Sequence, residues 1–340
     1  MNARPEKILA LQFKYFGDAV LLTPALRTLR AHFPAAEIHL LVPAEMAPLF
    51  QHLPWLTRVW PLLRQRGHAN LRATWPLIRA LRREHFDRSV DFAGNDRGAI
   101  LSRLIGARQR LGWAGDGGFW GRRFFYNQRV VPEKNRAHES ARLVQLLSGW
   151  QIPPPPSLEP EIRADAQLAV AAEKILPPEH VILCHVASSQ PKKEWPLPHW
   201  AEFHRLATAA GRRVVFTTAS GTREAALMAE LKKLVPRAEI LPGVPELPLF
   251  LAVLARAGVF ISGDTGPLHF AAGLGVPTIA LFGPTSPARW APMGDRHQFL
   301  TGGRCDCDGH SAVCTAAGHC LAAISPEQVF AALPKAFVSK

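Results

Sequence analysis

The chain has 340 residues, 48% of them hydrophobic and 20% charged, which is typical of a globular protein with one large or two medium domains. It lacks the run of roughly 20 apolar residues that a membrane-spanning helix needs. Lys and Arg outnumber Asp and Glu by 40 to 27, and the net charge of +13 favours an anionic partner: nucleic acid, an acidic membrane surface or a phosphorylated substrate.

The same charge balance also fits a basic protein from a GC-rich genome, in which Arg replaces Lys. The Arg residues are scattered, and no zinc-finger or RNA-binding signature accompanies them, so nucleic acid is the weaker option. Residues 1–7 lack the apolar region of a signal peptide, and a strand-like run follows at once. We therefore expect a cytoplasmic protein.

Strand and helix patterns alternate along the first half of the chain. Strands are expected at 7–13, 37–42, 59–60 and 88–92, and helices at 18–32 and 75–84. The helix at 75–84 (WPLIRALRRE) is basic and amphipathic. Alternation of this kind predicts a parallel sheet covered by helices.

Four consecutive prolines, 153–156, form a stiff extended segment that neither a helix nor a central strand tolerates. After it the alternation restarts, with strands expected at 181–187, 213–218, 239–241, 258–261 and 277–283, and helices at 199–210, 223–234 and 249–257. The sequence thus predicts two doubly wound α/β domains with a ligand cleft between them.

The expected boundaries follow from this pattern. They are an N-terminal Rossmann-like domain at 1–152, a linker at 153–158, a C-terminal Rossmann-like domain at 159–325 that contains the cysteine-rich segment 305–320, and a C-terminal helix within 326–340 that can pack back on the N-terminal domain.

The most informative run is 262–269 (SGDTGPLH), between two strand-like segments. A Gly-rich turn that opens a helix leaves backbone N–H groups unpaired at the positive end of the helix dipole. Pro267 suits a first helical position, where its missing N–H costs nothing. The run therefore predicts a site for a phosphate-bearing ligand. His269 falls on the first turn of the helix, where it can also be a packed or capping residue.

Two further loops follow predicted strands. Ser188, Ser189, Lys192 and Lys193 gather after the strand at 181–187, which suits a diphosphate but also fits an ordinary solvated loop. Glu224 follows the strand at 213–218 and can accept hydrogen bonds from ribose hydroxyls, or simply be a favourable residue at a helix start.

Asp18 follows the first strand, at the edge where doubly wound folds bind ligands, although a lone Asp there is most often an N-cap. No G-x-G-x-x-G follows that strand, and the chain contains no P-loop motif.

Three pieces together resemble glycosyltransferase family 9, the ADP-heptose lipopolysaccharide heptosyltransferases. They are 16–26 (FGDAVLLTPAL), 193–196 (KEWP) and 263–269 continuing to 275–285 (GVPTIALFGPT). Their order and spacing, from residue 7 to about residue 330, make the match specific, whereas 59–149 contributes little to it.

The resemblance implies a GT-B architecture of two Rossmann-like domains facing a cleft, in which the N-terminal domain binds the acceptor and the C-terminal domain binds the nucleotide sugar. It also implies an inverting, metal-independent transfer of heptose from ADP-heptose. It implies that Asp18 is the general base. Lys193 would neutralise the departing diphosphate, with Ser188 and Ser189 donating to the same oxygens and the amides of Thr265 and Gly266 acting from the other side. Asp264 would organise its loop by accepting hydrogen bonds from neighbouring amides.

Four of the five cysteines fall within 305–320, namely Cys305, Cys307, Cys314 and Cys320. In a cytoplasmic protein such a cluster points to a structural zinc or iron site, but free thiols and disulfides stay open. One branch of the resembled family, which heptosylates autotransporter proteins, has a four-cysteine iron site. No cofactor is expected for catalysis itself.

The function that these observations favour is heptosyl transfer to an anionic, lipid-linked saccharide of the lipopolysaccharide inner core. The expected location is the cytoplasmic face of the inner membrane, with the basic helix at 75–84 on its inner leaflet and no nucleic acid as partner. Two alternatives remain: transfer to a protein acceptor, and a non-catalytic nucleotide-sugar-binding protein. The presence of both Asp18 and Lys193 argues against the second.

Overall fold

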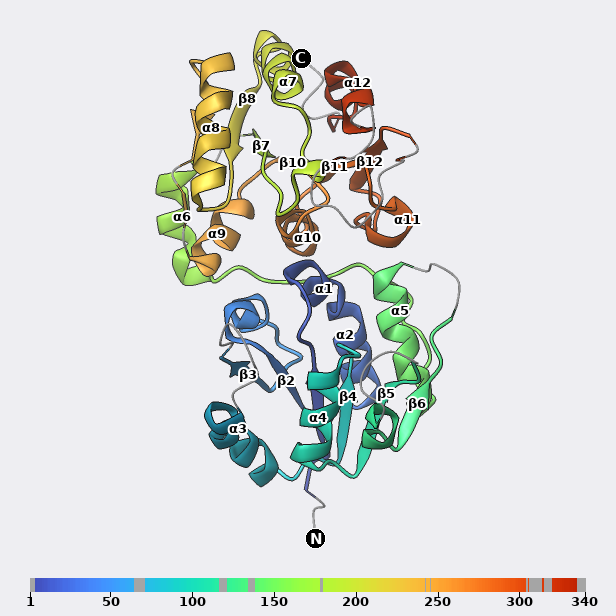
Figure 1. Cartoon of the computed structure of the whole chain (residues 1–340). Coiled ribbons are helices and arrows are strands. Elements are labelled where there is room, and N and C mark those ends of the chain that lie inside the picture. Colours follow the sequence, from blue (N-terminus) through green and yellow to red (C-terminus); the bar gives the residue numbers. More distant parts are fainter. Residues whose placement is uncertain are drawn as a thin grey trace. The chain divides into compact units, whose positions relative to one another are not determined.

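The computed structural model describes residues 4–63, 71–115, 121–133, 138–177, 180–241, 243–244, 246–303, 305, 314 and 320–334 (Figure 1). The chain divides into two compact units, Met1–Ile162 and Arg163–Lys340. No helix within the described ranges is long and apolar enough to cross a membrane.

Unit 1 is built on a parallel sheet to which the described residues contribute six strands, in the order β3-β2-β1-β4-β5-β6. The strands are β1 (Lys7–Leu11), β2 (Glu37–Pro43), β3 (Arg58–Leu62), β4 (Arg88–Asp91), β5 (Gln109–Trp113) and β6 (Gln128–Val130). The helices are α1 (Phe16–Leu21), α2 (Thr23–His32), α3 (Leu71–Arg83), α4 (Asp96–Ile105) and α5 (Glu139–Gln145), with the 3₁₀ turns η1 (Ala44–Leu49), η2 (Arg122–Phe125) and η3 (Leu146–Trp150).

The helix expected at 18–32 is two helices, α1 and α2, which meet at Leu22. Pro24 lies at the start of α2 and has no N–H with which to continue the hydrogen bonding of α1. Because α1 begins at Phe16 with Tyr15 as its N-cap, Asp18 lies inside the first turn. The N-cap interpretation of Asp18 is therefore wrong.

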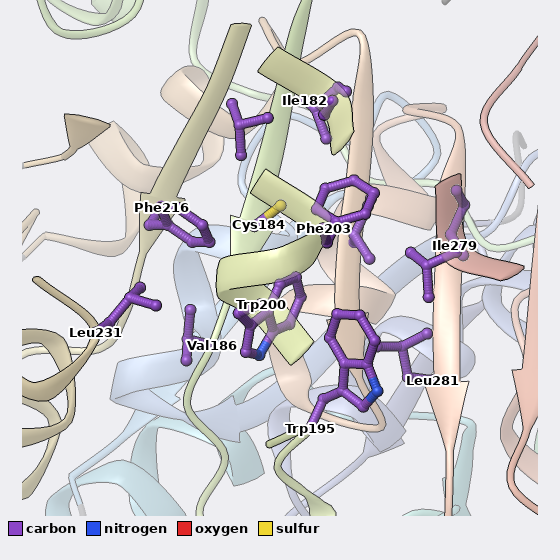
Figure 2. Close-up of a cluster of buried hydrophobic side chains, with 14 of the residues drawn as sticks. Ile182, Cys184, Val186, Trp195, Trp200, Phe203, Phe216, Leu231, Ile279 and Leu281 are labelled. Atoms are coloured by element: carbon purple, nitrogen blue, oxygen red, sulfur yellow. The ribbon is translucent and has the colours of Figure 1, made fainter. Parts of the chain in front are cut away.

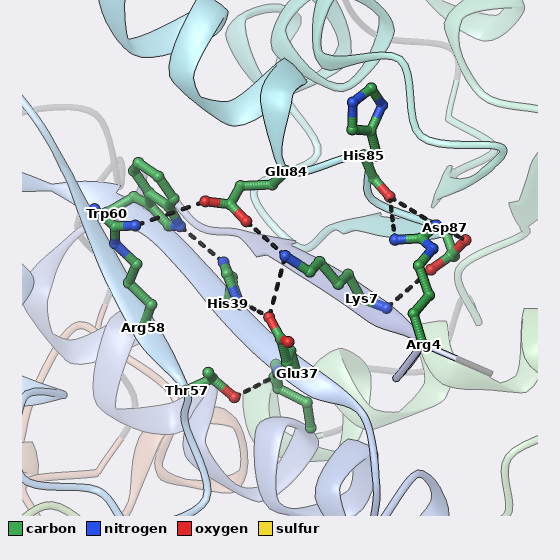
Figure 3. A network of polar contacts seen from close by, with 11 residues as sticks. Arg4, Lys7, Glu37, His39, Thr57, Arg58, Trp60, Glu84, His85 and Asp87 are labelled. Atoms are coloured by element: carbon green, nitrogen blue, oxygen red, sulfur yellow. Dashed lines mark hydrogen bonds and ion pairs between the residues drawn. The ribbon is translucent and has the colours of Figure 1, made fainter. Parts of the chain in front are cut away.

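A polar network lies at the amino ends of β1 and β2 (Figure 3). The Lys7 ammonium contacts Glu84 at 2.7 Å and Glu37 at 3.3 Å. The indole N–H of Trp60 donates to Nδ1 of the buried His39 at 3.0 Å, which leaves the proton of the neutral ring on Nε2, facing Glu37 at 3.4 Å. Burial lowers the pKa of His39, so this ring stays neutral. The network therefore stabilises the edge of the sheet at the amino ends of the strands, opposite to the edge at their carboxyl ends.

Unit 2 repeats the same plan with the order β12-β11-β10-β7-β8-β9 among its described strands, again all parallel. The strands are β7 (Val181–His185), β8 (Arg213–Thr217), β9 (Glu239–Ile240), β10 (Val259–Gly263), β11 (Thr278–Phe282) and β12 (His297–Thr301). The helices are α6 (Ala169–Ile175), α7 (Leu197–Ala209), α8 (Thr222–Leu234), α9 (Leu247–Leu254), α10 (Gly266–Gly273), α11 (Pro287–Trp290) and α12 (Pro326–Ala331), with η4 (Ala166–Leu168), η5 (Pro191–Lys193) and η6 (Cys320–Ala323).

Both sheets have the strand order 3-2-1-4-5-6 of a doubly wound fold, when unit 2 is read from β9 to β12. In such a sheet the chain changes direction once, between the first and fourth strands, and ligands bind outside the carboxyl ends of the strands at that point. The switch point lies between β1 and β4 in unit 1 and between β7 and β10 in unit 2. Ligands are therefore expected at these two places.

The core of unit 2 anchors the loop that follows β7 (Figure 2). Trp195 is buried among Trp200, Ile279 and Leu281, and it meets the Trp200 ring edge-on at 4.8 Å. Its indole N–H donates to the carbonyl of Ile324 at 3.0 Å. A large aromatic side chain that is both packed and hydrogen-bonded has little freedom, so the residues just before it are held at the sheet edge.

The boundary between the units lies after Ile162, later than the linker expected at 153–158. The reason is that the segment beyond the prolines bonds to α2: Arg27 donates to the carbonyls of Ser157 and Glu159, and the amide of Glu161 donates to Oγ1 of Thr23 at 2.9 Å.

The expectation that the C-terminal helix packs on the N-terminal domain stays a prediction. Helix α12 packs against α7 of its own unit, and Val329 belongs to the same core as Trp195. Residues 335–340 lie outside the described ranges.

Candidate functional site

The switch point of unit 2 brings together the loop after β7 and the loop after β10. Turn η5 places Lys193 directly over the end of β10, so closely that a Cβ on Gly263 would lie 2.4 Å from the Lys193 carbonyl oxygen. Only glycine fits at this position without moving the loop. The glycine of the 263–269 motif is therefore explained by the close approach of a second loop.

Lys193 and Asp264 form an ion pair at this point. The Lys193 ammonium lies 2.8 Å from Oδ2 of Asp264, and Nε2 of His269 lies 3.8 Å from Oδ1. Burial alone would raise the pKa of the Asp264 carboxyl, but the facing His269 ring and the Lys193 ammonium outweigh it and hold that pKa well below its usual range. Asp264 is thus a carboxylate at neutral pH.

This pairing corrects the expected role of Asp264. The carboxylate contacts the lysine that follows β7, whereas the sequence predicted contacts with neighbouring amides. The ion pair orients the Lys193 ammonium, whose other N–H groups can donate to a ligand. Sequence reasoning missed the pair because its two residues are 71 positions apart and belong to separate motifs.

Helix α10 begins beside this pair, with Thr265 as an extended N-cap and Pro267 in the first turn. In the described part of the chain, the amides of Thr265 and Gly266 have no hydrogen-bond acceptor. Nδ1 of the buried His269 also lacks a partner there. The first turn of a helix with unpaired N–H groups favours an anion, so the predicted anion-binding character of this run fits the local geometry.

The loop after β7 contains two serines in different surroundings. Ser188 is buried, its amide donates to Oε1 of Glu194 at 2.8 Å, and its hydroxyl accepts from the amide of Gln190 at 3.4 Å. Ser189 is exposed. Lys192 lies in the same loop and is buried. Lys192 is therefore not a solvated surface lysine.

Glu224 lies in the first turn of α8, as expected, beside a residue that the sequence did not single out. The Arg223 guanidinium makes two hydrogen bonds to Glu194, at 2.7 and 3.2 Å, and donates to the carbonyl of Ser188. It also lies 3.4 Å from Glu224. The sequence marks Glu194 only as part of the 193–196 motif, without a role of its own, and marks Arg223 only by its adjacency to Glu224.

At the switch point of unit 1, Asp18 is buried in α1 and follows the end of β1. A second carboxyl that the sequence did not single out, Asp91, ends the neighbouring strand β4 and is fully buried. It accepts from the Tyr126 hydroxyl at 2.5 Å and from the amides of Ala93 and Gly94. Burial raises the pKa of Asp91 to about 6, despite these hydrogen bonds.

Lys14 lies in the same region, within electrostatic range of Asp18 and Asp91. Burial lowers its pKa, and the nearby charge of Arg142 lowers it further. Arg142 itself is paired with the buried Glu139. The carboxyl-end edge of this sheet is therefore lined by charged groups of both signs.

The cysteine prediction is tested only in part. Cys307 lies outside the described residues, whereas Cys305, Cys314 and Cys320 lie within them and form no disulfide. No group of three or more His, Cys, Asp or Glu side chains is placed to hold a metal ion in the described ranges. The metal site remains a prediction.

Two doubly wound parallel sheets, each in its own unit, define a two-domain α/β protein of the GT-B class. Solved structures agree with this fold. A family 9 glycosyltransferase from Veillonella parvula superposes with a TM-score of 0.82 over 100% of this chain and 99% of that one, at 18% identity. The ADP-heptose LPS heptosyltransferase II of Escherichia coli does so with a TM-score of 0.78 over 98% of both chains, at 21% identity.

Sequence comparison gives the family. The model of glycosyltransferase family 9 (heptosyltransferase) matches residues 74–312. The lipopolysaccharide heptosyltransferase 2 of Escherichia coli K12 is 24% identical over 311 residues, which cover 86% of this chain and 87% of that protein. The chain belongs to glycosyltransferase family 9, and it is a glycosyltransferase.

Proposed function

We propose that this enzyme transfers heptose from ADP-heptose to a saccharide of the lipopolysaccharide inner core, with inversion at the anomeric carbon and without a metal ion. The names of its sequence relatives support the donor sugar and the pathway. The observation that carries the proposal is the Lys193–Asp264 pair beside the first turn of α10, because this arrangement suits a departing diphosphate.

In unit 2, Lys193 donates to the diphosphate oxygens together with Ser188 and Ser189, and the amides of Thr265 and Gly266 donate from the start of α10. A lysine and a helix N-terminus supply positive potential that a divalent cation provides in other sugar-nucleotide enzymes. Asp264 holds the lysine in place. Glu224, in the first turn of α8, accepts hydrogen bonds from the ribose hydroxyls, and His269 lies beside the phosphate-binding turn.

In unit 1, which we assign to the acceptor, Asp18 acts as the general base. It takes the proton of the acceptor hydroxyl while that oxygen attacks the anomeric carbon, the bond from that carbon to the diphosphate breaks, and ADP leaves. Attack from the side opposite the leaving group inverts the configuration. Its position supports this role, because Asp18 lies in the first turn of α1, just beyond the end of β1.

The exposed face of α3 supports an acceptor at a membrane surface. Trp75 is 47% exposed on this helix, and the Arg79, Arg82 and Arg83 side chains are exposed beside it. An aromatic ring and cations on one helix suit the interface of an anionic bilayer. We therefore place the enzyme in the cytoplasm, peripheral to the inner leaflet of the inner membrane, where an anionic lipid-linked saccharide would meet it.

A transfer assay tests the proposal directly. The protein is incubated with ADP-, UDP- or GDP-sugars and with inner-core saccharide acceptors that lack heptose, with and without EDTA. We expect transfer from ADP-heptose alone, unchanged by EDTA, and NMR of the product should show inverted anomeric configuration. Transfer only to a protein acceptor, or binding of ADP-heptose without any transfer, would instead identify one of the two alternative functions.

A further inference from the structure

The loop after β7 and the start of α8 are joined by one ion pair, Glu194–Arg223. Two hydrogen bonds link the guanidinium to the carboxylate, at 2.7 Å to Oε1 and 3.2 Å to Oε2. This is the fork-to-fork geometry that gives an arginine–carboxylate pair its directionality. Glu194 is only 12% exposed, so water competes less for it than for a pair in open solvent.

The same pair holds both backbone polar groups of Ser188. The Ser188 amide donates to Oε1 of Glu194 at 2.8 Å, and the Ser188 carbonyl accepts from Nη2 of Arg223. A peptide segment bound on its donor and its acceptor side has a fixed orientation. The pair therefore sets the direction in which the Ser188 and Ser189 side chains leave the loop.

Each member of the pair also adjoins a residue with a proposed ligand contact. Glu194 directly follows Lys193, and Arg223 directly precedes Glu224, whose carboxylate lies 3.4 Å from the guanidinium. One ion pair thus links the residues proposed for the diphosphate to the residue proposed for the ribose. Buried Trp195 anchors the loop immediately after Glu194.

We propose that Glu194 and Arg223 are positioning residues for the nucleotide, which hold the diphosphate-binding loop and Glu224 at the spacing that ADP requires. This inference rests on the proposed function of unit 2. The pair touches no reacting atom in this scheme. It acts through Ser188, Lys193 and Glu224. Because the pair already restricts the conformations of these residues in the free protein, less conformational entropy is lost when ADP binds.

The test measures ADP affinity by calorimetry in single substitutions. Glu194→Ala removes the acceptor for both the guanidinium and the Ser188 amide, so we expect ADP to bind about ten- to a hundredfold more weakly, the range for losing hydrogen bonds to a charged group. Glu194→Gln keeps an oxygen that can accept from the Ser188 amide, and should retain affinity to within about threefold. If Gln restores the ADP affinity, and if the melting temperature of Glu194→Ala without ADP equals that of the wild-type protein, the loss of affinity is due to positioning and not to a general loss of stability.

The chain offers a matched control in the Glu202–Arg205 pair of α7, which has contacts of 2.6 and 2.8 Å and belongs to the same unit. Glu202→Ala removes an ion pair that lies within α7 and bonds to no residue of the loop after β7, so it should leave ADP affinity within about twofold. The double variant Glu194→Ala/Arg223→Ala should bind no more weakly than the worse single variant, since both changes release the same loop.

Arg223→Lys tests the pair independently in case Glu194→Ala does not fold. Lysine keeps the charge but cannot make two parallel hydrogen bonds, so ADP affinity should fall severalfold while the protein remains folded. Wild-type affinity in folded Arg223→Lys or Glu194→Ala would overturn the positioning role and leave the proposed function intact. Failure of the wild-type protein to bind ADP would overturn both.

Discussion

The ammonium of Lys193 lies 2.8 Å from the carboxylate of Asp264, and this contact joins two loops at the switch point of the second sheet. Lys193 follows β7 and Asp264 follows β10, and these strands are neighbours in the sheet. The ion pair is thus a direct consequence of the strand order, and it creates a fixed cation at the edge where a doubly wound fold binds its ligand.

Replacing Lys193 should weaken nucleotide binding and slow transfer together. Lys193→Ala removes the cation that we assign to the diphosphate, and ADP affinity and transfer rate should both fall at least tenfold. Lys193→Arg should recover only part of the loss, because a planar guanidinium does not replace a compact ammonium in a tight site. Calorimetry with ADP and steady-state kinetics measure the two effects, and unchanged ADP affinity in Lys193→Ala would remove the lysine from the phosphate site.

Asp18 should matter for the rate and little for the nucleotide. In Asp18→Asn the side chain keeps its shape but cannot accept a proton, so turnover should fall by about 10²- to 10⁴-fold, the usual effect of losing a general base. ADP affinity should stay within about twofold of wild type, since ADP is assigned to the other unit. Turnover that survives within a few-fold would show that another group is the base.

Gly263 should be intolerant of a single added carbon. A Cβ there would lie 2.4 Å from the Lys193 carbonyl oxygen, a backbone atom that can move only if the whole loop moves. Gly263→Ala should therefore weaken ADP binding and lower the melting temperature. Gly243→Ala is the control, because a Cβ at that position has open space around it; equal behaviour of the two variants would contradict the close approach.

Asp91 should make stability depend on pH in an unusual direction for a carboxyl group. Its pKa is raised from 3.8 to about 6 in the folded protein, so between these values the folded state binds more protons than the unfolded state. Its contribution to stability is complete below about pH 4 and is lost as pH rises through 6, to a total of about 3 kcal/mol.

Asp91→Asn should remove that dependence. The difference between wild-type and Asp91→Asn unfolding free energies, measured by urea titration from pH 4 to pH 7, isolates Asp91 from histidines that titrate in the same range, such as His185. We expect the wild-type protein to lose stability relative to the variant as pH rises. A flat difference would mean that Asp91 is ionised throughout.

The cysteine segment can be tested by elemental analysis of protein purified without chelators. If Cys305, Cys307, Cys314 and Cys320 hold a structural ion, zinc or iron should be present at about one ion per chain, and replacing Cys307 with Ser should remove it and lower the melting temperature. Metal-free protein with wild-type stability would show that the thiols hold no ion.

Most of the strand pattern could be predicted because the strands of a parallel sheet are buried on both faces and therefore continuously apolar, as in 181–185 (VILCH). The helix boundaries were less predictable. The break at Leu22 depends on how α1 and α2 pack, and the end of unit 1 depends on the bonds of Arg27 and Thr23 to the segment after the prolines. Such long-range contacts leave no local pattern.

By itself the sequence determined the two alternating halves, the Gly-rich turn at 263–269 and the membership of a sugar-transferring family, because each depends on local composition and order. Only the tertiary structure decided which side chains share a site. It pairs Lys193 with Asp264, links Glu194 to Arg223, and buries Asp91, which accepts a hydrogen bond from Tyr126. Strand pairing brings distant segments to one sheet edge, and there burial and neighbouring charge, which no local sequence encodes, set the chemistry of each group.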